Sequence, residues 1–176
     1  MKPVVTEHES PLPALQARSR RTVEALTAAA FELLTTVAFE DLAIGDVVER
    51  AGSSTGSFYA RFPSKDDFLF HLADRLLKDQ LAPLAAEALS AEKHVRASLK
   101  LRTHSAIAFI GESFVRHRAI LRPVTLMMHT TKDQRLRALA VTFNGPVHRA
   151  FKQLILAAPE IRETVRITRA VDNVIQ

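Results

Sequence analysis

Hydroxyl side chains gather around a glycine in the stretch SSTGSFYARF, residues 53–62. Ser54, Thr55 and Ser57 carry short hydroxyl groups, which can reach phosphate oxygens or base edges of a nucleic acid. Gly56 lies among them, although glycine disfavours a helix because it loses more backbone entropy on ordering than other residues. Without a side chain there, the amides at the positive end of a helix can approach a phosphate closely. Ordinary turn chemistry after a preceding helix is the alternative explanation.

Catalytic and metal chemistry have little support in the sequence. The chain contains no cysteine, which excludes disulfides, thiolate zinc sites and thiol nucleophiles. Its histidines are too widely spaced for a local chelate, and His-Glu-x-x-His, Gly-x-Ser-x-Gly and glycine-rich phosphate loops are all absent. We therefore expect a binding protein rather than an enzyme, with no catalytic residue, no metal and no cofactor.

Helical periodicity predicts the elements that position the glycine. Apolar residues at steps of three and four predict helices over residues 18–36 and 44–51, and Gly52 suits a left-handed cap at the end of the second. The hydroxyls of Ser53 and Ser54 can cap a third helix, which runs to Phe62 before Pro63. Ser64 then caps a fourth helix that extends to about Leu81, near Pro83.

Three short helices with a tight turn between the second and third are the layout of a helix-turn-helix. The last helix of that motif enters the DNA major groove by its N-terminal residues, which here are the residues around Gly56. Phe58 and Phe62 lie four positions apart and are expected to anchor the opposite face in the core. Tyr59 points outward, where its hydroxyl can contact a phosphate.

This arrangement resembles the TetR family of transcriptional regulators over roughly residues 18–70. The resemblance implies an all-α homodimer with an N-terminal DNA-binding domain and a C-terminal domain that binds a small molecule and dimerises. It also implies DNA contact at Ser54, Thr55, Gly56, Ser57, Tyr59 and Lys65. The residues that carry the resemblance are Arg20, Ala29-Ala30, Phe39-Glu40, Ile44, Asp46-Val47, Ala51-Gly52, Ser54, Gly56-Ser57-Phe58-Tyr59, Phe62 and Ser64-Lys65-Asp66.

The chain departs from the family pattern at several positions. Ala43 stands where a threonine usually caps the second helix, and Asp41 could substitute for it in part. Ala38 replaces the usual glycine after the first helix, and Ala60 lacks the polar side chain common at its position. Arginines at residues 18–21 could reach the DNA backbone, but a solvated helix start explains them equally well.

The expected organisation is a flexible arm over residues 1–17, a helix-turn-helix DNA-binding domain over 18–64 and a helical ligand-binding and dimerisation domain over 65–176. In this C-terminal domain we expect one helix over about residues 91–117. Residues 119–131 should form one or two short helical pieces around Pro123. A longer helix should run from after Asp133 to about Ala157, with an interruption at residues 144–146. A final amphipathic segment follows Pro159.

A ligand pocket is expected among the C-terminal helices, where apolar and adaptable side chains gather close to His104 and His129. Met and Phe at helical spacing are more often core filling, which is the alternative interpretation. The candidate lining residues are Phe109, Ile110, Phe114, Met127, Met128 and Phe143.

Charge is unevenly distributed along the chain. The net charge is +5, yet residues 18–65 hold six basic and six acidic side chains, whereas residues 93–137 hold ten basic and two acidic ones. That excess would let an anionic or acyl ligand be tolerated near the mouth of the pocket, although solvated helix faces explain it about as well. No apolar run long enough for a membrane span and no signal peptide are recognisable, so we expect a cytoplasmic protein that does not bind membranes.

Two functional hypotheses follow. The first is a TetR-type regulator, most simply a repressor. It binds double-stranded DNA at a palindromic operator and is released by a small-molecule effector. The second is a helical small-molecule-binding protein with only non-specific DNA binding, which Ala43, Ala60 and the balanced charge of residues 18–65 favour.

Overall fold

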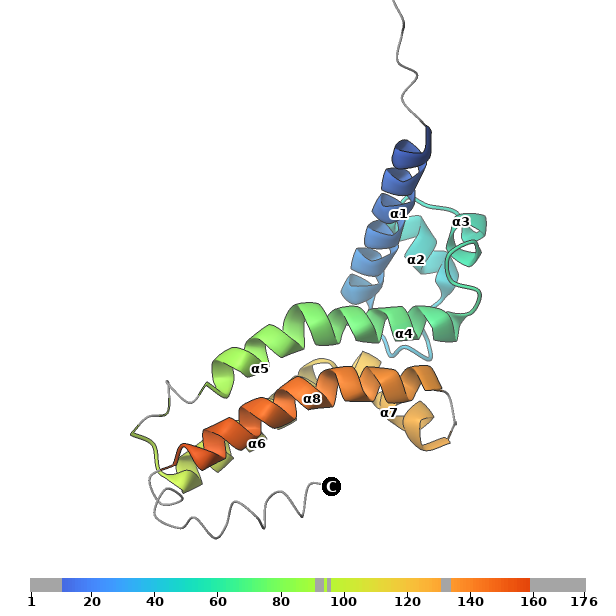
Figure 1. Ribbon diagram of the computed structural model, residues 1–176. Helices are drawn as coiled ribbons and strands as arrows, with labels where there is room; N and C mark the ends of the chain where they lie inside the picture. Colours follow the sequence, from blue (N-terminus) through green and yellow to red (C-terminus); the bar gives the residue numbers. More distant parts are fainter. Residues whose placement is uncertain (1–10, 91–93, 95, 131–133, 159–176) are drawn as a thin grey trace, which may run out of the picture. The chain divides into compact units, whose positions relative to one another are not determined.

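The computed structural model describes residues 11–90, 94, 96–130 and 134–158, and every regular element in them is a helix (Figure 1). This confirms the predicted all-α class. The chain divides into two compact units, residues 1–68 and 69–176, which are described separately below. The helices are α1 (Pro11–Leu33), α2 (Ile44–Arg50), α3 (Thr55–Tyr59), α4 (Lys65–Arg75), the π-helix η1 (Leu76–Leu81), α5 (Ala82–Ala88), α6 (Leu99–Arg116), α7 (Arg118–Thr130) and α8 (Gln134–Leu156).

Helix α1 starts earlier than the sequence pattern indicated. It begins at Pro11, so the last part of the expected flexible arm over residues 1–17 is helical. Prolines are compatible with this start, because amides in the first turn of a helix have no intrahelical acceptor to lose. The helix ends at Leu33, before the expected Thr36, and the hydroxyls of Thr35 and Thr36 donate to the carbonyls of Glu32 (2.7 Å) and Leu33 (3.0 Å).

The tight turn between α2 and α3 has the geometry that Gly52 predicted. Gly52 adopts a φ of 57°, the left-handed conformation that favours glycine. Its amide donates to the carbonyl of Glu49 at 3.1 Å, and the amide of Ser53 donates to the carbonyl of Val48 at 2.8 Å. These two bonds form a Schellman motif, which satisfies carbonyls at the C-terminus of α2. The chain is thereby reversed into α3.

Aromatic packing holds α3 in the first unit. Phe58 is fully buried, and its ring centroid lies 5.4 Å from Phe62 and 5.0 Å from Phe68, with an edge-to-face contact to the latter. The predicted anchoring face of α3 is therefore confirmed. The helix is shorter than expected and ends at Tyr59, although the amide of Phe62 still donates to the carbonyl of Phe58 at 2.9 Å.

Ser64 caps α4 as predicted, because its hydroxyl oxygen accepts the amide of Asp67 at 3.0 Å. The helix does not continue as a regular α-helix to Leu81. From Leu76 the chain winds as the wider π-helix η1, and α5 follows with Pro83 in its first turn. Proline cannot donate the hydrogen bond that a regular helix would need there, and π-type turns accommodate such interruptions.

The core of the second unit lies between α5, α6 and α8. Ala85, Leu89, Ala106 and Leu154 are buried together, and Phe109 packs against them. Helix α6 begins at Leu99, eight residues after the expected start, because Ser98 provides its N-cap by accepting the amide of Leu101 at 3.4 Å.

Helix α7 is a single helix, one of the two possibilities expected around Pro123, whereas α8 lacks the interruption expected at residues 144–146. Pro123 lies inside the single helix α7 and is buried, and α8 continues without a break through residues 144–146. Packing of α7 and α8 against each other outweighs the hydrogen bond that each proline removes. The expected final amphipathic segment after Pro159 lies outside the described residues.

A buried arginine joins the ends of two helices in the second unit. Arg102 of α6 has no exposed surface. Its guanidinium donates to the carbonyls of Ala97 at 2.9 Å and Leu154 at 2.8 Å, and also to that of His94. Leu154 belongs to the last turn of α8, whose carbonyls lack intrahelical donors. Arg102 therefore ties the start of α6 to the end of α8.

Candidate nucleic-acid interface and ligand cavity

The N-terminus of α3 presents unsatisfied backbone amides. The hydroxyl oxygen of Ser54 accepts the amide of Ser57 at 3.1 Å, and the carbonyl of Ser54 accepts the amide of Phe58 at 3.0 Å. The amides of Thr55 and Gly56 open the helix, where no intrahelical acceptor exists. Both residues are exposed, so this helix end can donate to an external acceptor such as a phosphate oxygen.

Nothing inside the first unit requires a glycine at position 56. Gly56 does not have a positive φ, and a Cβ added to it would meet no heavy atom within 4 Å. Gly52, by contrast, is required by its left-handed backbone. The glycine at position 56 weakens α3 by about 0.5–1 kcal/mol relative to alanine with no internal compensation. Backbone conformation and packing within the first unit therefore do not require the glycine.

The side chains around Gly56 divide into solvent-facing and anchoring groups. Tyr59 is 49% exposed, as predicted, and its ring meets Phe58 edge to face at 5.2 Å. Ser57 is half-buried and Thr55 is exposed. Arg61, which the sequence reasoning did not select, donates from Nη1 to the carbonyl of Ser57 at 2.7 Å and so supports the C-terminal half of α3.

Lys65 lies at the start of α4 and is held by the loop that follows α1. Its Nζ donates to the carbonyl of Glu40 at 2.9 Å and lies 5.0 Å from the centre of the Phe39 ring. An ammonium group has three donor hydrogens, so a second acceptor can still bind. These contacts fix the direction of the side chain before any partner arrives.

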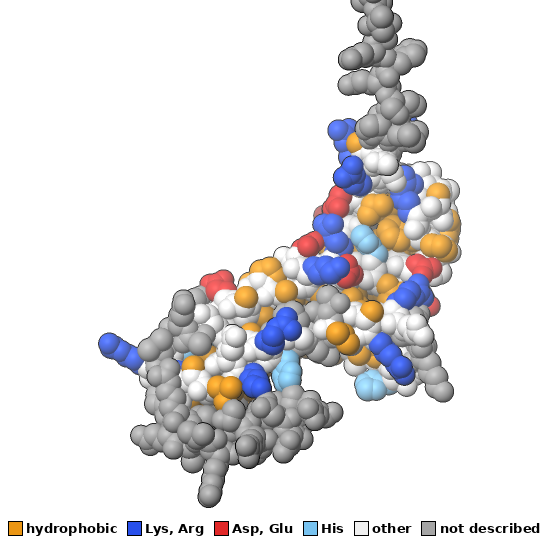
Figure 2. Space-filling model, viewed as in Figure 1, with side chains coloured by type: hydrophobic (Ala, Val, Ile, Leu, Met, Phe, Trp, Pro, Cys, Tyr) orange, Lys and Arg blue, Asp and Glu red, His pale blue; other side chains and the backbone are white. Residues whose placement is uncertain are grey.

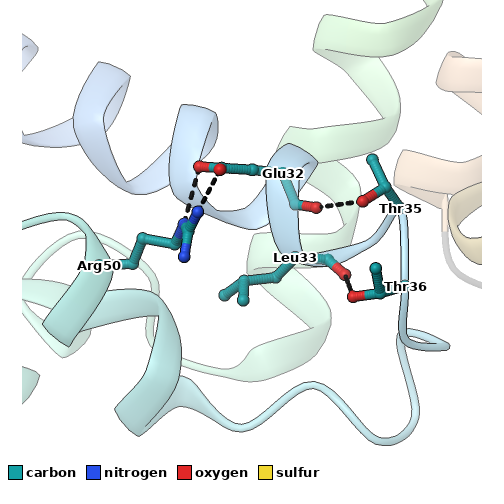
Figure 3. Close-up of polar contacts among 5 residues, drawn as sticks. All are labelled: Glu32, Leu33, Thr35, Thr36 and Arg50. Carbon is teal, nitrogen blue, oxygen red and sulfur yellow. Dashed lines mark hydrogen bonds and ion pairs between the residues drawn. The ribbon is translucent and has the colours of Figure 1, made fainter.

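An exposed ion pair joins α1 to α2 (Figure 3). Arg50 donates from Nε to Glu32 at 2.7 Å, and its Nη2 contacts the other carboxylate oxygen. The hydrogen bonds from Arg50 lower the pKa of the Glu32 carboxyl, and the carboxylate in turn raises the pKa of Arg50. The two-point contact links the C-terminal ends of α1 and α2 at the surface.

The start of α2 lacks a side-chain cap. Ala43 occupies the N-cap position and no side chain there accepts a helix amide, so Asp41 does not replace the missing threonine hydroxyl. The expected charge balance is visible on the face drawn in Figure 2, where basic and acidic side chains of the first unit are interspersed. Local geometry, rather than a basic patch on that face, therefore distinguishes the N-terminus of α3.

The second unit contains an apolar cavity of about 350 Å³. Phe109, Ile110, Phe114 and Met128 of the predicted set line it, together with His129. Met127 is half-buried but does not line it, and the side chain of Phe143 is outside the described set. The full lining is Leu77, Leu81, Phe109, Ile110, Ser113, Phe114, Leu121, Val124, Thr125, Met128, His129, Leu139 and Val147.

A second space of about 370 Å³, here called the polar hollow, is lined by α5, the end of α6 and Leu81. Glu87, Glu112, Arg116 and His117 contribute its polar groups. Burial lowers the pKa of His117, and the neighbouring positive charge of Arg116 lowers it further.

Two arginines with structural roles were missed by the sequence reasoning. Arg50 has no local signal, because its partner lies 18 positions away. Arg102 had a signal: it falls four positions before the buried Ala106, on the stripe that the helical period assigns to the core. Charged residues at such positions are buried only when their donors are satisfied, as they are here.

Comparison with known proteins identifies the first unit. Residues 26–72 match the family described as bacterial regulatory proteins, tetR family. An uncharacterized HTH-type transcriptional regulator, YwcC of Bacillus subtilis (strain 168), is 37% identical over 60 residues. That similarity covers 34% of this chain and 27% of the relative, so the chain spans about a quarter of the regulator it matches. Among the described residues, no helix has the length and apolarity to cross a membrane.

Proposed function

The chain belongs to the TetR family of bacterial regulatory proteins, and from this premise we propose that it is a repressor that a small-molecule effector releases from a palindromic operator. The first unit would read the DNA through the N-terminus of α3, and two copies would bind the two half-sites. Two-fold symmetry requires recognition helices about 34–36 Å apart, one turn of the DNA helix. The cavity of the second unit would hold the effector.

The exposed glycine at position 56 carries this proposal. Neither backbone conformation nor internal packing explains it, whereas close approach of a phosphate to the free amides of Thr55 and Gly56 does. Ser54, Thr55 and Ser57 would add hydroxyl contacts beside those amides. Tyr59 and Lys65 would contact the flanking phosphates, the first through its exposed hydroxyl and the second through a side chain already held by Glu40.

Replacement of Gly56 by valine tests the placement directly. A branched side chain would hold the backbone away from the groove, so affinity for a selected operator should drop by more than about tenfold. Gly111→Val is the matched control, because Gly111 is also an exposed helical glycine with open space around its Cβ position. Fluorescence anisotropy against an operator recovered by DNA selection, and against a scrambled duplex, gives both affinities.

Equal losses in the two valine variants would attribute the effect to helix propensity and reject α3 as the reading helix. The missing cap at Ala43 favours the second candidate function, a small-molecule-binding protein with only non-specific DNA binding. That candidate predicts equal binding of the two duplexes, which weakens steeply as the salt concentration rises. A preference for the operator that persists at higher salt contradicts it.

A further inference from the structure

The apolar cavity and the polar hollow adjoin each other. Both are lined by Leu81, Phe109 and Ser113, so the two spaces lie on either side of these three side chains. Ser113 is the smallest of the three and is half-buried. An elongated molecule that fills the apolar cavity would therefore extend past Ser113 into the polar hollow.

The apolar cavity suits an uncharged, hydrocarbon-rich group. Hydroxyls and one imidazole are its polar side-chain groups, and the hydroxyl of Thr125 already donates to the carbonyl of Leu121 at 2.7 Å. None of the side chains that line it in the described structure carries a carboxylate, ammonium or guanidinium. An ionised ligand group placed there would lose its hydration without gaining a counter-ion, which is costly.

The polar hollow has the opposite character, because charged side chains line it. Glu87 and Glu112 contribute two carboxylates, and Arg116 contributes one guanidinium. In the part of the chain that the structure describes, no ion pair within 4 Å is found for the Glu112 carboxylate. His117 adds little positive charge at neutral pH, because its pKa lies below the ordinary value. A positive group entering from the apolar cavity would meet Glu112 beyond Ser113.

We infer that the effector of this protein is an amphiphile, with an apolar body in the cavity and a positively charged head in the polar hollow facing Glu112. The inference rests on the proposed function only in treating the cavity as the effector site. It differs from the expectation based on the basic stretch over residues 93–137, which was that an anionic or acyl ligand could be tolerated. Arg116 is the one basic residue of that stretch found along the described lining of either space.

Three probes with the same hydrocarbon chain test the charge of the head. Isothermal titration calorimetry of the full chain would use decyltrimethylammonium and decyl sulfate below their micelle-forming concentrations, and 1-decanol below its solubility limit. We expect the ammonium to bind about threefold more tightly than the alcohol and about tenfold more tightly than the sulfate, because attraction by a solvent-accessible carboxylate becomes repulsion.

Two substitutions in the hollow should act in opposite directions. Glu112→Gln should remove the preference for the ammonium over the alcohol, whereas Arg116→Gln should increase it. Both side chains are exposed, so neither change should unfold the unit, which circular dichroism would verify. Ser113→Phe, which fills the boundary between the two spaces, should weaken binding of all three probes.

Tightest binding of the sulfate would overturn the inference. So would equal binding of the three probes, a preference that Glu112→Gln leaves unchanged, or the absence of saturable binding by every probe. None of these measurements contains DNA. If wild-type protein shows no specific operator binding, the proposed repressor function is rejected, but the preference among the probes is unaffected. Failure of the proposed function can therefore be distinguished from failure of this inference.

Discussion

Large aromatic side chains pack against one another in the first unit but border a cavity in the second. In the first, the rings of Phe58, Phe62 and Phe68 pack on one another with centroids 4.8–5.4 Å apart. In the second, Phe109 and Phe114 line a cavity of about 350 Å³. Close packing fixes α3 in one orientation, which suits a surface that must match a rigid groove. A cavity bordered by adaptable side chains instead suits a small ligand such as the effector proposed above.

Removal of the central ring should break the first unit alone. Phe58→Ala leaves a cavity among three aromatic side chains and should destabilise this unit by about 3–5 kcal/mol. Hydrogen exchange followed by mass spectrometry should show lost protection in α2 and α3 with retained protection in α6 and α8. Tyr59→Ala serves as the control with a smaller loss, because its ring is already 49% exposed.

Equal loss of protection in both units would break the comparison, because it would mean that they unfold as one cooperative body. The Phe58→Ala protein would then be uninformative about α3, and DNA binding would be compared in Gly56→Val instead. Retained protection throughout the variant would show that the aromatic cluster does not hold α3.

The corresponding change in the second unit is Arg102→Met. It keeps much of the buried volume but removes the donors to the carbonyls of His94, Ala97 and Leu154. A buried acceptor left without a partner costs about 1–3 kcal/mol, so we expect a loss of about 2–4 kcal/mol in the second unit. Exchange should accelerate at the C-terminal end of α8 while α2 and α3 stay protected.

Arg116→Met is the matched control, since Arg116 is exposed on the same helix. If both variants lose the same hydrogen-exchange protection, removal of a positive charge from α6 explains the loss. The contacts of Arg102 with the three carbonyls would then not be its cause. If Arg102→Met also exposes α3, the distinction between an aromatic anchor in one unit and a hydrogen-bonded anchor in the other fails.

The turn and the helix caps that the sequence predicted correctly depend on short-range contacts. Gly52, Ser54 and Ser64 act on amides and carbonyls a few residues away, so the turn and both caps follow from spacing alone. The predicted DNA contacts at α3 remain predictions. Their exposed, uncompensated glycine is nevertheless a feature that the sequence pattern singled out.

Long-range packing decided the features that were wrong or missed. The sequence at residues 144–146 indicates a helix interruption locally, yet α8 continues through it and packs on neighbouring helices. The pairing of Arg50 with Glu32 likewise depends on residues brought together by the fold. Side-chain convergence also explains why Met128 lines the cavity and the adjacent Met127 does not.

The smallest expected effect concerns pH and belongs to the second unit. The folded pKa of His117 lies below its ordinary value of 6.5, chiefly because burial disfavours the charged imidazole. The unfolded chain therefore binds the proton more readily, and stability must rise with pH. The contribution is complete above about pH 6.5 and is lost as the pH falls towards the folded pKa.

His117→Gln should reduce the pH dependence of the urea midpoint between pH 7.5 and 5.5. Identical slopes in wild type and variant would show that the imidazole stays solvated at the end of α6. The polar hollow of the second unit would then not bury His117.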